Sequence, residues 1–457
     1  MNRWPVAASR RRVALIRPGV NRGRLYRWYA PLCSREAPLG LLYIAGNLLK
    51  HNFEVSIVDG EQIGNRAVIA RMRELRPEVI GLTATTFSFD QAAALVKLIR
   101  EILPESLIVM GGPHVSALPH DTMSELSELD GCVVGEGEEA MLEIASAIAP
   151  ERIAGLVWRA SDGEVRNNAV REFACNLDEY RPSWQLLDNF PNWYQPGFQD
   201  RNRGRSTSMV ASRGCSYNCS FCAGPGIHGN RRRSHSPEYV VATMLSLASQ
   251  YGISNFYFHD DNFTQDKDWL AEFCDRLELA NTNLCWSCAS RVEQLSRLML
   301  ERMRRAGCIQ LGIGVESSSD RILQWLNKST TFSVVRQTLG DIHAAGIETK
   351  LYLIIGTPIE TIAELAATLR NILKVGAAHI QMIYFTPLPG TADAVRNGAG
   401  RRMWRRMNLL NPISTSRSRG YFLRLVELAF YGCFYARKSL SMLRSSVQFA
   451  MSRGFLL

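Results

Sequence analysis

The sequence has little that marks a disordered or a secreted chain. Its 457 residues contain 46% apolar and 21% charged residues, which is typical of a folded globular protein. No signal peptide is recognised at its start, and its eleven cysteines are an odd number, which argues against a secreted disulfide framework. We therefore expect a cytoplasmic protein of two or three domains, because one hydrophobic core rarely organises a chain of this length.

One dense group of cysteines lacks a fourth member. Cys215, Cys219 and Cys222 follow the apolar run Met209–Ala211, which we expect to end a strand. Three thiolates at Cys-x3-Cys-x2-Cys spacing converge on one small object, and an iron–sulfur cluster fits best. The alternatives are a structural zinc ion, which normally needs four protein ligands, and a chance group of core cysteines. In a cubane cluster, three cysteines leave one iron open.

This loop, with Phe221 just before its last cysteine, resembles the signature of the radical S-adenosylmethionine (SAM) enzymes. In that family SAM chelates the open iron, and one-electron reduction splits its sulfonium to give a 5′-deoxyadenosyl radical. The resemblance implies a [4Fe-4S] cluster on Cys215, Cys219 and Cys222, SAM as a second cofactor with Phe221 beside it, and an external one-electron donor such as flavodoxin or ferredoxin.

Residues 1–150 alternate short apolar strands with helices. Strands are predicted at Val13–Ile16, Val55–Val58, Val79–Leu82, Leu107–Met110 and Cys132–Val134. Helices are predicted at Leu39–Leu49, Asn65–Arg76, Phe89–Leu103 and Glu138–Ala149. This alternation predicts an α/β fold with a doubly wound parallel sheet, in which ligands lie outside the carboxyl ends of the strands.

Glycines, hydroxyls and one histidine follow three of these strands. The candidates for binding a large planar ligand are Thr83, Thr85, Gly112, His114, Gly135, Glu136 and Gly137. Each loop alone fits ordinary turn chemistry equally well. Together, and in this order along the chain, they resemble the Rossmann-like cobalamin-binding domain that precedes the radical domain in one large subfamily, which implies cobalamin as a third cofactor.

A motif that often supplies an axial histidine to cobalamin is misplaced here. Asp341, His343 and Gly346 match Asp-x-His-x-x-Gly, but they close a predicted helix in the other domain, with Gly346 as its C-cap. The equivalent loop of the first domain, Pro18–Leu39, contains no histidine. We therefore interpret His343 as structural and expect the lower face of cobalamin to have no protein ligand.

A hairpin and a linker are predicted over residues 151–203, followed by a partial (β/α)6 radical SAM barrel over residues 204–397. Its strands are predicted at Thr207–Ser212, Asn255–Phe258, Leu284–Ala289, Ile309–Gly314, Lys350–Ile355 and His379–Tyr384. Six repeats are fewer than the eight of a closed barrel, so we expect an open side and active residues at the carboxyl ends of the strands.

Polar residues stand at those ends. The resemblance implies that Asp260 or Asp261 holds the amino group of SAM, and the spacing leaves the choice open. Arg291 is expected to pair with the carboxylate of SAM. Glu316, with Ser317 beside it, suits the ribose hydroxyls, and Gly356 begins a turn that resembles the family's adenine-contacting turn. Any single carboxylate here could equally be a helix cap.

Other cysteines have structural interpretations. Cys285 and Cys288 have the spacing of a redox motif, but they lie within a predicted strand, where their sulfurs face opposite sides. Cys132, Cys274 and Cys308 sit in apolar settings and are expected to be buried.

The tail, residues 398–457, carries the net charge of +10. From Arg396 onward the sequence has twelve Arg and Lys against one acid, Glu427, in a basic amphipathic helical pattern. It is too short and too charged to span a bilayer. Either it lies on an anionic membrane or covers the access route of a hydrophobic substrate, or it is a helix pair packed on the barrel with a solvated basic face, which we favour. Nucleic-acid binding is disfavoured, because no nucleic-acid module accompanies the charge.

We predict a cobalamin-dependent radical SAM C-methyltransferase. In this class one SAM methylates cobalamin, and a second generates the radical that activates an unreactive carbon of a small-molecule substrate. We expect that substrate to be a natural-product intermediate of an antibiotic pathway. The alternatives are an anaerobic oxidative cyclase that acts on porphyrin precursors and a non-catalytic protein that binds the cobalamin and the cluster.

Overall fold

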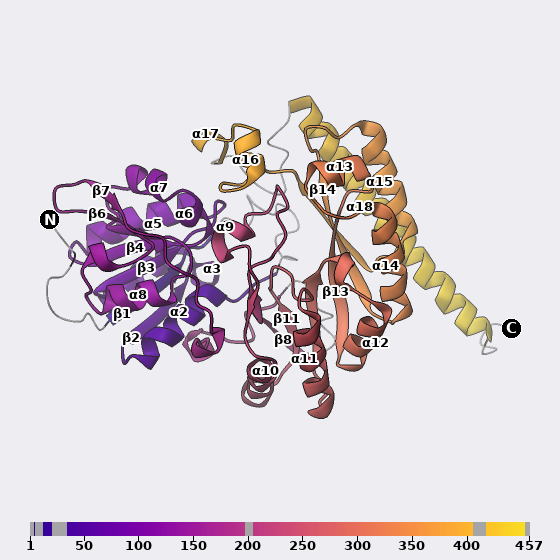
Figure 1. The fold of residues 1–457 in the computed structure, drawn as a ribbon, viewed down its shortest axis with the longest axis horizontal. Helices are drawn as coiled ribbons and strands as arrows, with labels where there is room; N and C mark the ends of the chain where they lie inside the picture. The colour runs from indigo at the N-terminus through magenta and orange to yellow at the C-terminus, as the bar shows by residue number, and fades with distance from the viewer. Residues whose placement is uncertain (1–3, 5–11, 21–33, 197–203, 405–416, 453–457) are drawn as a thin grey trace.

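The computed structural model describes Trp4 and residues 12–20, 34–196, 204–404 and 417–452. Two sheets, each covered by helices, lie next to each other (Figure 1). The first sheet lies in the N-terminal half and the second in the C-terminal half, as the alternation of strands and helices predicts.

The first sheet has seven strands in the order β2-β1-β3-β4-β5-β6-β7. Its parallel strands are β1 (Arg12–Arg17), β2 (Glu54–Asp59), β3 (Val79–Thr83), β4 (Leu107–Gly111) and β5 (Gly131–Val133). The hairpin β6 (Leu156–Arg159) and β7 (Val165–Asn167) adds to β5 in antiparallel fashion. The predicted hairpin is therefore confirmed, and it extends the first sheet.

Helices cover both faces of this sheet. Alternation along β1 sends Val13 and Leu15 toward one face, where α2 (Leu39–Lys50) and α8 (Glu138–Ala145) pack. It sends Ala14 and Ile16 toward the opposite face, against α4 (Asn65–Leu75) and α5 (Phe89–Ile102). Shorter helices follow the strands at α3 (Gly60–Ile63), α6 (Pro113–Ala117) and α7 (Pro119–Glu125). This is the predicted doubly wound architecture.

The second sheet has six parallel strands in the order β15-β14-β13-β12-β11-β8. They are β8 (Arg205–Met209), β11 (Ile253–Phe258), β12 (Cys285–Ser290), β13 (Cys308–Glu316), β14 (Glu348–Ile355) and β15 (His379–Tyr384). Because β8 and β15 are the two edges of this curled sheet, it is a partial barrel, as predicted.

Helices alternate with these strands. The main ones are α10 (Pro237–Tyr251), α11 (Lys267–Leu279), α12 (Arg297–Arg305), α13 (Asp320–Trp325), α14 (Phe332–Ala344), α15 (Ile362–Lys374) and α16 (Ala392–Arg396). The start of α10 follows from its sequence, because the Ser236 side chain accepts from the Tyr239 amide and Pro237 occupies the first turn. His343 lies in α14 and bonds Thr349, so it is remote from the first sheet, as expected.

The tail contains α17 (Arg401–Trp404) and the long helix α18 (Arg417–Ser452). Leu423, Phe430 and Phe434 of α18 are buried against the barrel. The helix continues past the barrel toward the C terminus (Figure 1). No helix in the described part of the chain combines the length and apolarity needed to cross a bilayer.

Candidate active site

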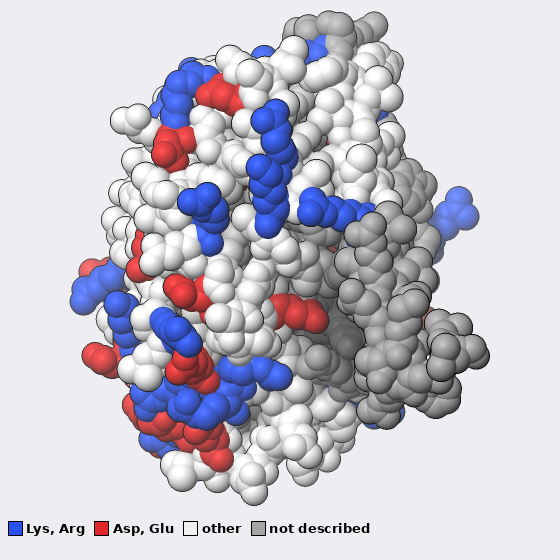
Figure 2. Space-filling view, turned by 90° about the vertical axis from the view of Figure 1, so that its right-hand side faces the viewer, with Lys and Arg blue, Asp and Glu red and all other residues white. Residues whose placement is uncertain are grey.

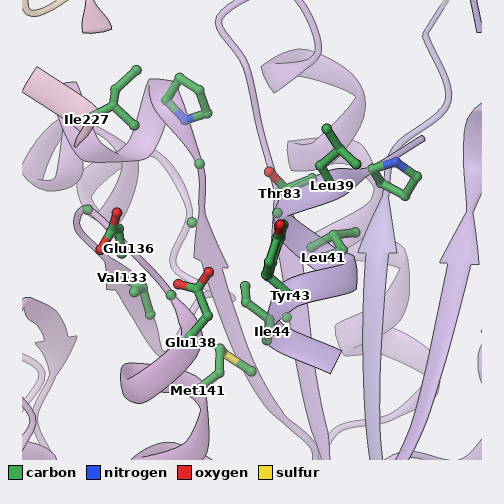
Figure 3. A pocket seen from close by; sticks show the side chains of 18 of the residues that line it. Leu39, Leu41, Tyr43, Ile44, Thr83, Val133, Glu136, Glu138, Met141 and Ile227 are labelled. Carbon is green, nitrogen blue, oxygen red and sulfur yellow. The ribbon is translucent and has the colours of Figure 1, made fainter. Parts of the chain in front are cut away.

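A cavity of about 360 Å³ lies where the carboxyl edge of the first sheet faces the second domain. The first domain contributes its strand ends and side chains of α2 and α8, including Tyr43, Ile44 and Met141 (Figure 3). The second domain contributes the loop after β8 and the end of β11, including Arg213, His228 and Asp261. The strand ends of the first sheet and the ends of β8 and β11 therefore open onto one space. The three cysteines and the predicted SAM residues Arg291, Glu316, Ser317 and Gly356 do not line it.

Five of the predicted cobalamin residues line this cavity: Thr83, Gly112, Gly135, Glu136 and Gly137. Gly135 has φ +83°, and a Cβ atom there would meet nothing within 4 Å, so its backbone borders open space. A Cβ atom on Gly137 would lie 2.8 Å from Cδ1 of Ile44. Because glycine has no side chain, this part of the cavity lining leaves room for a broad planar ring such as a corrin.

Two predicted cobalamin residues lie elsewhere. Thr85 forms a local turn in which its Oγ1 is 3.1 Å from Oγ of Ser88. The His114 ring is buried, stacks on Phe89 at 4.2 Å and lies 3.2 Å from Oγ1 of Thr86. Burial lowers the pKa of His114 to about 4. The turn after β4 directs this ring into the helical layer, which residue spacing alone does not predict.

The cysteine loop has the surroundings of a cluster site. The Gly224 amide donates to Sγ of Cys222 at 3.4 Å, and Nη1 of Arg291 donates to Sγ of Cys219 at 3.1 Å. Burial raises the pKa of the Cys222 thiol to about 11, so iron must displace a proton when it binds. Within the described residues, no three Cys, His, Asp or Glu side chains gather around one ion position. N–H donors aimed at two of the three cysteine sulfurs fit an iron–sulfur cluster, whose thiolate ligands accept such hydrogen bonds.

The two aspartates of the family motif have different environments. Asp260 is buried and accepts from the Ala211 amide at 2.9 Å and from the Ser212 hydroxyl. Burial raises its pKa to about 6. Asp261 is exposed, lines the cavity and accepts from the Gly214 amide at 3.0 Å. Asp261 is therefore the aspartate that a ligand in the cavity can reach.

The other predicted SAM residues are already partnered. Arg291 contacts Glu293 at 3.1 Å and stacks 3.8 Å from the ring centroid of Tyr217. Glu316 accepts from Nζ of Lys328 at 2.7 Å, and both side chains are buried. Its φ of +60° is unusual for a non-glycine residue, and such backbone concentrates at functional sites.

Ser317 and Gly356 are also held by internal contacts. The Ser317 hydroxyl is buried 3.2 Å from Oγ1 of Thr368. Gly356 has φ +79°, and its amide donates to Oε2 of Glu360 at 2.6 Å. Phe221 lies half-buried against a small cluster that contains Leu326 and Phe385. Ser317 directly follows β13 and Gly356 directly follows β14, where the sequence places them.

A buried ion cluster joins the two domains, and sequence reasoning missed it. Arg213, directly before the cysteine loop, donates to Oε1 of Glu138 at 2.6 Å and lies 3.2 Å from Oε1 of Glu136. Arg233 pairs with Arg213 across strands β9 (Ser212–Arg213) and β10 (Arg233–Ser234) and also bonds Glu136 at 2.7 Å. Although burial raises the pKa of Glu136, the two guanidiniums bring it below its ordinary value. The cysteine loop is thereby fixed to the loop that contains Glu136, one of the predicted cobalamin residues.

A second contact between the domains lies at the mouth of the barrel. Oε2 of Glu36, from the loop before α2, is 3.0 Å from Nε2 of His259. Lys350 of β14 faces the same carboxylate, and burial lowers its pKa to about 8 although Glu36 acts in the opposite direction. His259 follows β11 in the predicted motif, but its partner is distant in the sequence.

The remaining cysteines agree with their structural interpretation. Cys132, Cys274, Cys288 and Cys308 are fully buried free thiols. Cys285 is half-buried at the start of β12.

Comparison with known proteins defines the class. A B12 binding domain profile matches residues 33–145, and a radical SAM superfamily profile matches residues 209–372. The uncharacterized methyltransferase PH0819 of Pyrococcus horikoshii is 32% identical over 414 residues, covering 86% of this chain and 87% of the relative. The anaerobic magnesium-protoporphyrin IX monomethyl ester cyclase of Rubrivivax gelatinosus is 26% identical over 390 residues, covering 83% and 68%.

A solved structure shares the fold. The radical SAM methyltransferase TsrM of Kitasatospora setae, solved with cobalamin and a [4Fe-4S] cluster, superposes with a TM-score of 0.68 at 19% identity. The match covers 84% of this chain and 74% of that one.

The fold and the site thus define a radical SAM enzyme with a preceding cobalamin-binding domain. The chain belongs to the cobalamin-dependent radical SAM methyltransferases. Its cofactors are a [4Fe-4S] cluster, SAM and cobalamin.

Proposed function

We propose that this enzyme transfers a methyl group from SAM, by way of cobalamin, to an unactivated carbon of a small-molecule natural-product intermediate. The cavity carries the proposal, because the cobalamin loops and the residues beside the cysteine loop line the same space. A substrate there would contact both cofactors. The proposed setting is the cytoplasm, with flavodoxin or ferredoxin as the electron donor.

In this proposal the cofactors supply the methyl carrier and the radical chemistry, and the protein positions them. Cys215, Cys219 and Cys222 hold the cluster, and Arg291 donates a hydrogen bond to Sγ of Cys219. Asp261 holds the amino group of SAM, because it is the exposed aspartate at the cavity. Glu316 accepts hydrogen bonds from the ribose hydroxyls of SAM, and Gly356 begins the turn that contacts the adenine.

On the other side, Thr83, Gly112, Gly135, Glu136 and Gly137 border cobalamin. The described residues that the first domain contributes to the cavity include no histidine. We therefore propose that the lower face of cobalamin has no protein ligand. The electron paramagnetic resonance spectrum of the cob(II)alamin-loaded protein should then lack splitting from a coordinated nitrogen, and histidine labelled with 15N should not alter the spectrum.

Methylation is tested with SAM that carries a labelled methyl group. Anaerobic, reduced holoenzyme incubated with an extract of the cells that express the enzyme should transfer the label to a small molecule. The same reaction should form 5′-deoxyadenosine. Transfer of the label that does not depend on Cys219 would contradict the proposal.

A cyclase is the second candidate function, and the identity to the Rubrivivax gelatinosus enzyme favours it. The same experiment separates the two. A cyclase would form 5′-deoxyadenosine and change its substrate without adding a labelled methyl group.

A further inference from the structure

The outer face of α18 is apolar over a long described stretch. Between residues 421 and 436 the exposed positions are Tyr421, Phe422, Leu425, Leu428, Ala429, Gly432, Cys433, Tyr435 and Ala436. Tyr421 and Leu425 are each 68% exposed, and Leu428 is 53% exposed. A helix on a protein surface ordinarily turns charged residues toward water. This face departs from that rule and from the solvated basic face that we favoured from the sequence.

The charged residues of this stretch lie beside the exposed face. They are Arg424 and Glu427, and both are half-buried. Glu427 accepts a hydrogen bond from the Tyr384 hydroxyl of β15. The acid is therefore engaged with the barrel and does not interrupt the apolar face.

The opposite face of α18 is fixed on the barrel. Leu423, Phe430 and Phe434 are buried there. Arg419 donates to the carbonyl of Glu360 at 2.9 Å, and Arg437 donates to the carbonyl of Leu373 at 3.2 Å. These contacts set the rotation of the helix about its axis. The exposed apolar residues consequently belong to a second, outward apolar face.

A contiguous apolar face of this kind usually marks an interaction surface. Figure 2 looks onto this side of the molecule, where the upper right is mostly uncharged and the lower left mixes both signs of charge. The sequence from Arg396 onward has twelve Arg and Lys and one acid. Like charges disfavour pairing with a second copy of the same tail, whereas a negatively charged surface is attracted by about 1 kcal/mol per nearby basic residue.

We propose that the outer face of α18 binds an anionic lipid membrane, with the helix axis parallel to the membrane plane. Tyr421, Leu425 and Leu428 enter the interface between headgroups and acyl chains, and the net positive charge of the tail sequence attracts the anionic surface. This goes beyond the proposed function and does not depend on it, because binding needs no catalysis.

Vesicle flotation with the full-length, cofactor-loaded protein tests this proposal. The protein should float with vesicles of phosphatidylcholine and phosphatidylglycerol, float much less with phosphatidylcholine alone, and be released by salt. The double variant Leu425→Ser, Leu428→Ser should bind the anionic vesicles at least about tenfold less. The matched control is Leu279→Ser, Leu298→Ser, since these leucines are 84% and 76% exposed outside the tail, and it should bind like the wild type.

Four results would overturn the proposal. They are no binding of the wild-type protein to anionic vesicles, equal binding to neutral vesicles, an equal loss in the control variant, and unchanged binding by the Leu425 and Leu428 variant. A dimer that this variant splits, seen by sedimentation without vesicle binding, would show that a second copy occupies the face. If the variant fails to fold, Tyr421→Ser with Phe422→Ser provides the same comparison.

Discussion

The carboxyl strand edges of the two sheets are built differently. The edge of the first sheet presents glycines and apolar side chains around open space, as at Gly135 and Gly137, and its carboxylates Glu136 and Glu138 pair with arginines of the second domain. The edge of the barrel presents charged side chains that already have partners, as in Glu316 with Lys328 and Arg291 with Glu293. The first edge therefore has open space that can bind a ligand through complementary shape.

Charged side chains at the barrel edge must exchange their present partners for groups of the ligand when it binds. A buried pair such as Glu316 and Lys328 resists separation, because an unpaired buried charge costs several kcal/mol. A ligand that engages Glu316 must therefore accommodate Lys328 as well. This difference predicts that substitutions at the two edges impair different properties of the protein, and the following variants test this prediction.

Loss of a cluster ligand should have the largest effect. Cys219→Ala should abolish the cluster and 5′-deoxyadenosine formation, since two thiolates and a solvent ligand hold the cluster poorly. Hydroxocobalamin affinity should stay within about twofold, because the first edge binds by shape. Iron analysis, mass spectrometry of reduced samples and an absorbance titration measure the three properties. Cys285→Ala, outside the loop, is the control, and an active Cys219→Ala enzyme would refute the assignment.

The next largest effect should come from the ion cluster that joins the edges. Arg213→Met leaves Glu138 buried without its cation and should reduce the free energy of unfolding by about 3–5 kcal/mol. Adding Glu138→Gln should recover part of this loss, whereas Glu136 keeps Arg233. Urea unfolding of the three proteins measures the effect. Equal midpoints for wild type and Arg213→Met would mean that the cluster does not couple the domains.

A smaller effect is expected where the first edge borders open space. Gly135→Ala should weaken hydroxocobalamin binding by about tenfold, because its methyl group enters the cavity, and should cost about 1–2 kcal/mol of stability for its positive φ. Gly163→Ala is a close control, since Gly163 has φ +87°, no neighbour within 4 Å of a Cβ atom, and a place outside the cavity. Equal affinities of the two variants would argue that cobalamin lies elsewhere.

The smallest effect on function is a pH dependence at the barrel edge, which changes only the free energy of unfolding. Burial raises the pKa of Glu360 to about 7, above its ordinary value of 4.5. Folding therefore favours the protonated acid, and this stabilisation is lost as the pH rises from about 4.5 through 7. Glu360→Gln keeps an acceptor for the Gly356 amide and cannot ionise. The free energy of unfolding of Glu360→Gln minus that of the wild type should increase by about 2 kcal/mol between about pH 5 and pH 8. A constant difference would contradict the shifted pKa.

Sequence reasoning succeeded where chemistry depends on local spacing. Strand positions follow from apolar alternation, and the cysteine loop follows from three residues close together in the chain. It missed Arg213 with Glu138 and Glu36 with His259, because these partners come from different domains and no spacing links them. It listed His114 among the candidate cobalamin residues, whereas the ring packs against Phe89 outside the cavity lining. The direction of a side chain after a strand depends on such packing and not on spacing. The apolar outer face of α18 was hidden because both sides of that helix are apolar.

The central claim is that cluster and cobalamin face one shared cavity. Electron paramagnetic resonance of the reduced protein loaded with both the [4Fe-4S]⁺ cluster and cob(II)alamin tests it most directly. The account predicts that each signal is broadened or split by the other, relative to samples that contain one paramagnet. A spectrum equal to the sum of the two separate signals would contradict it.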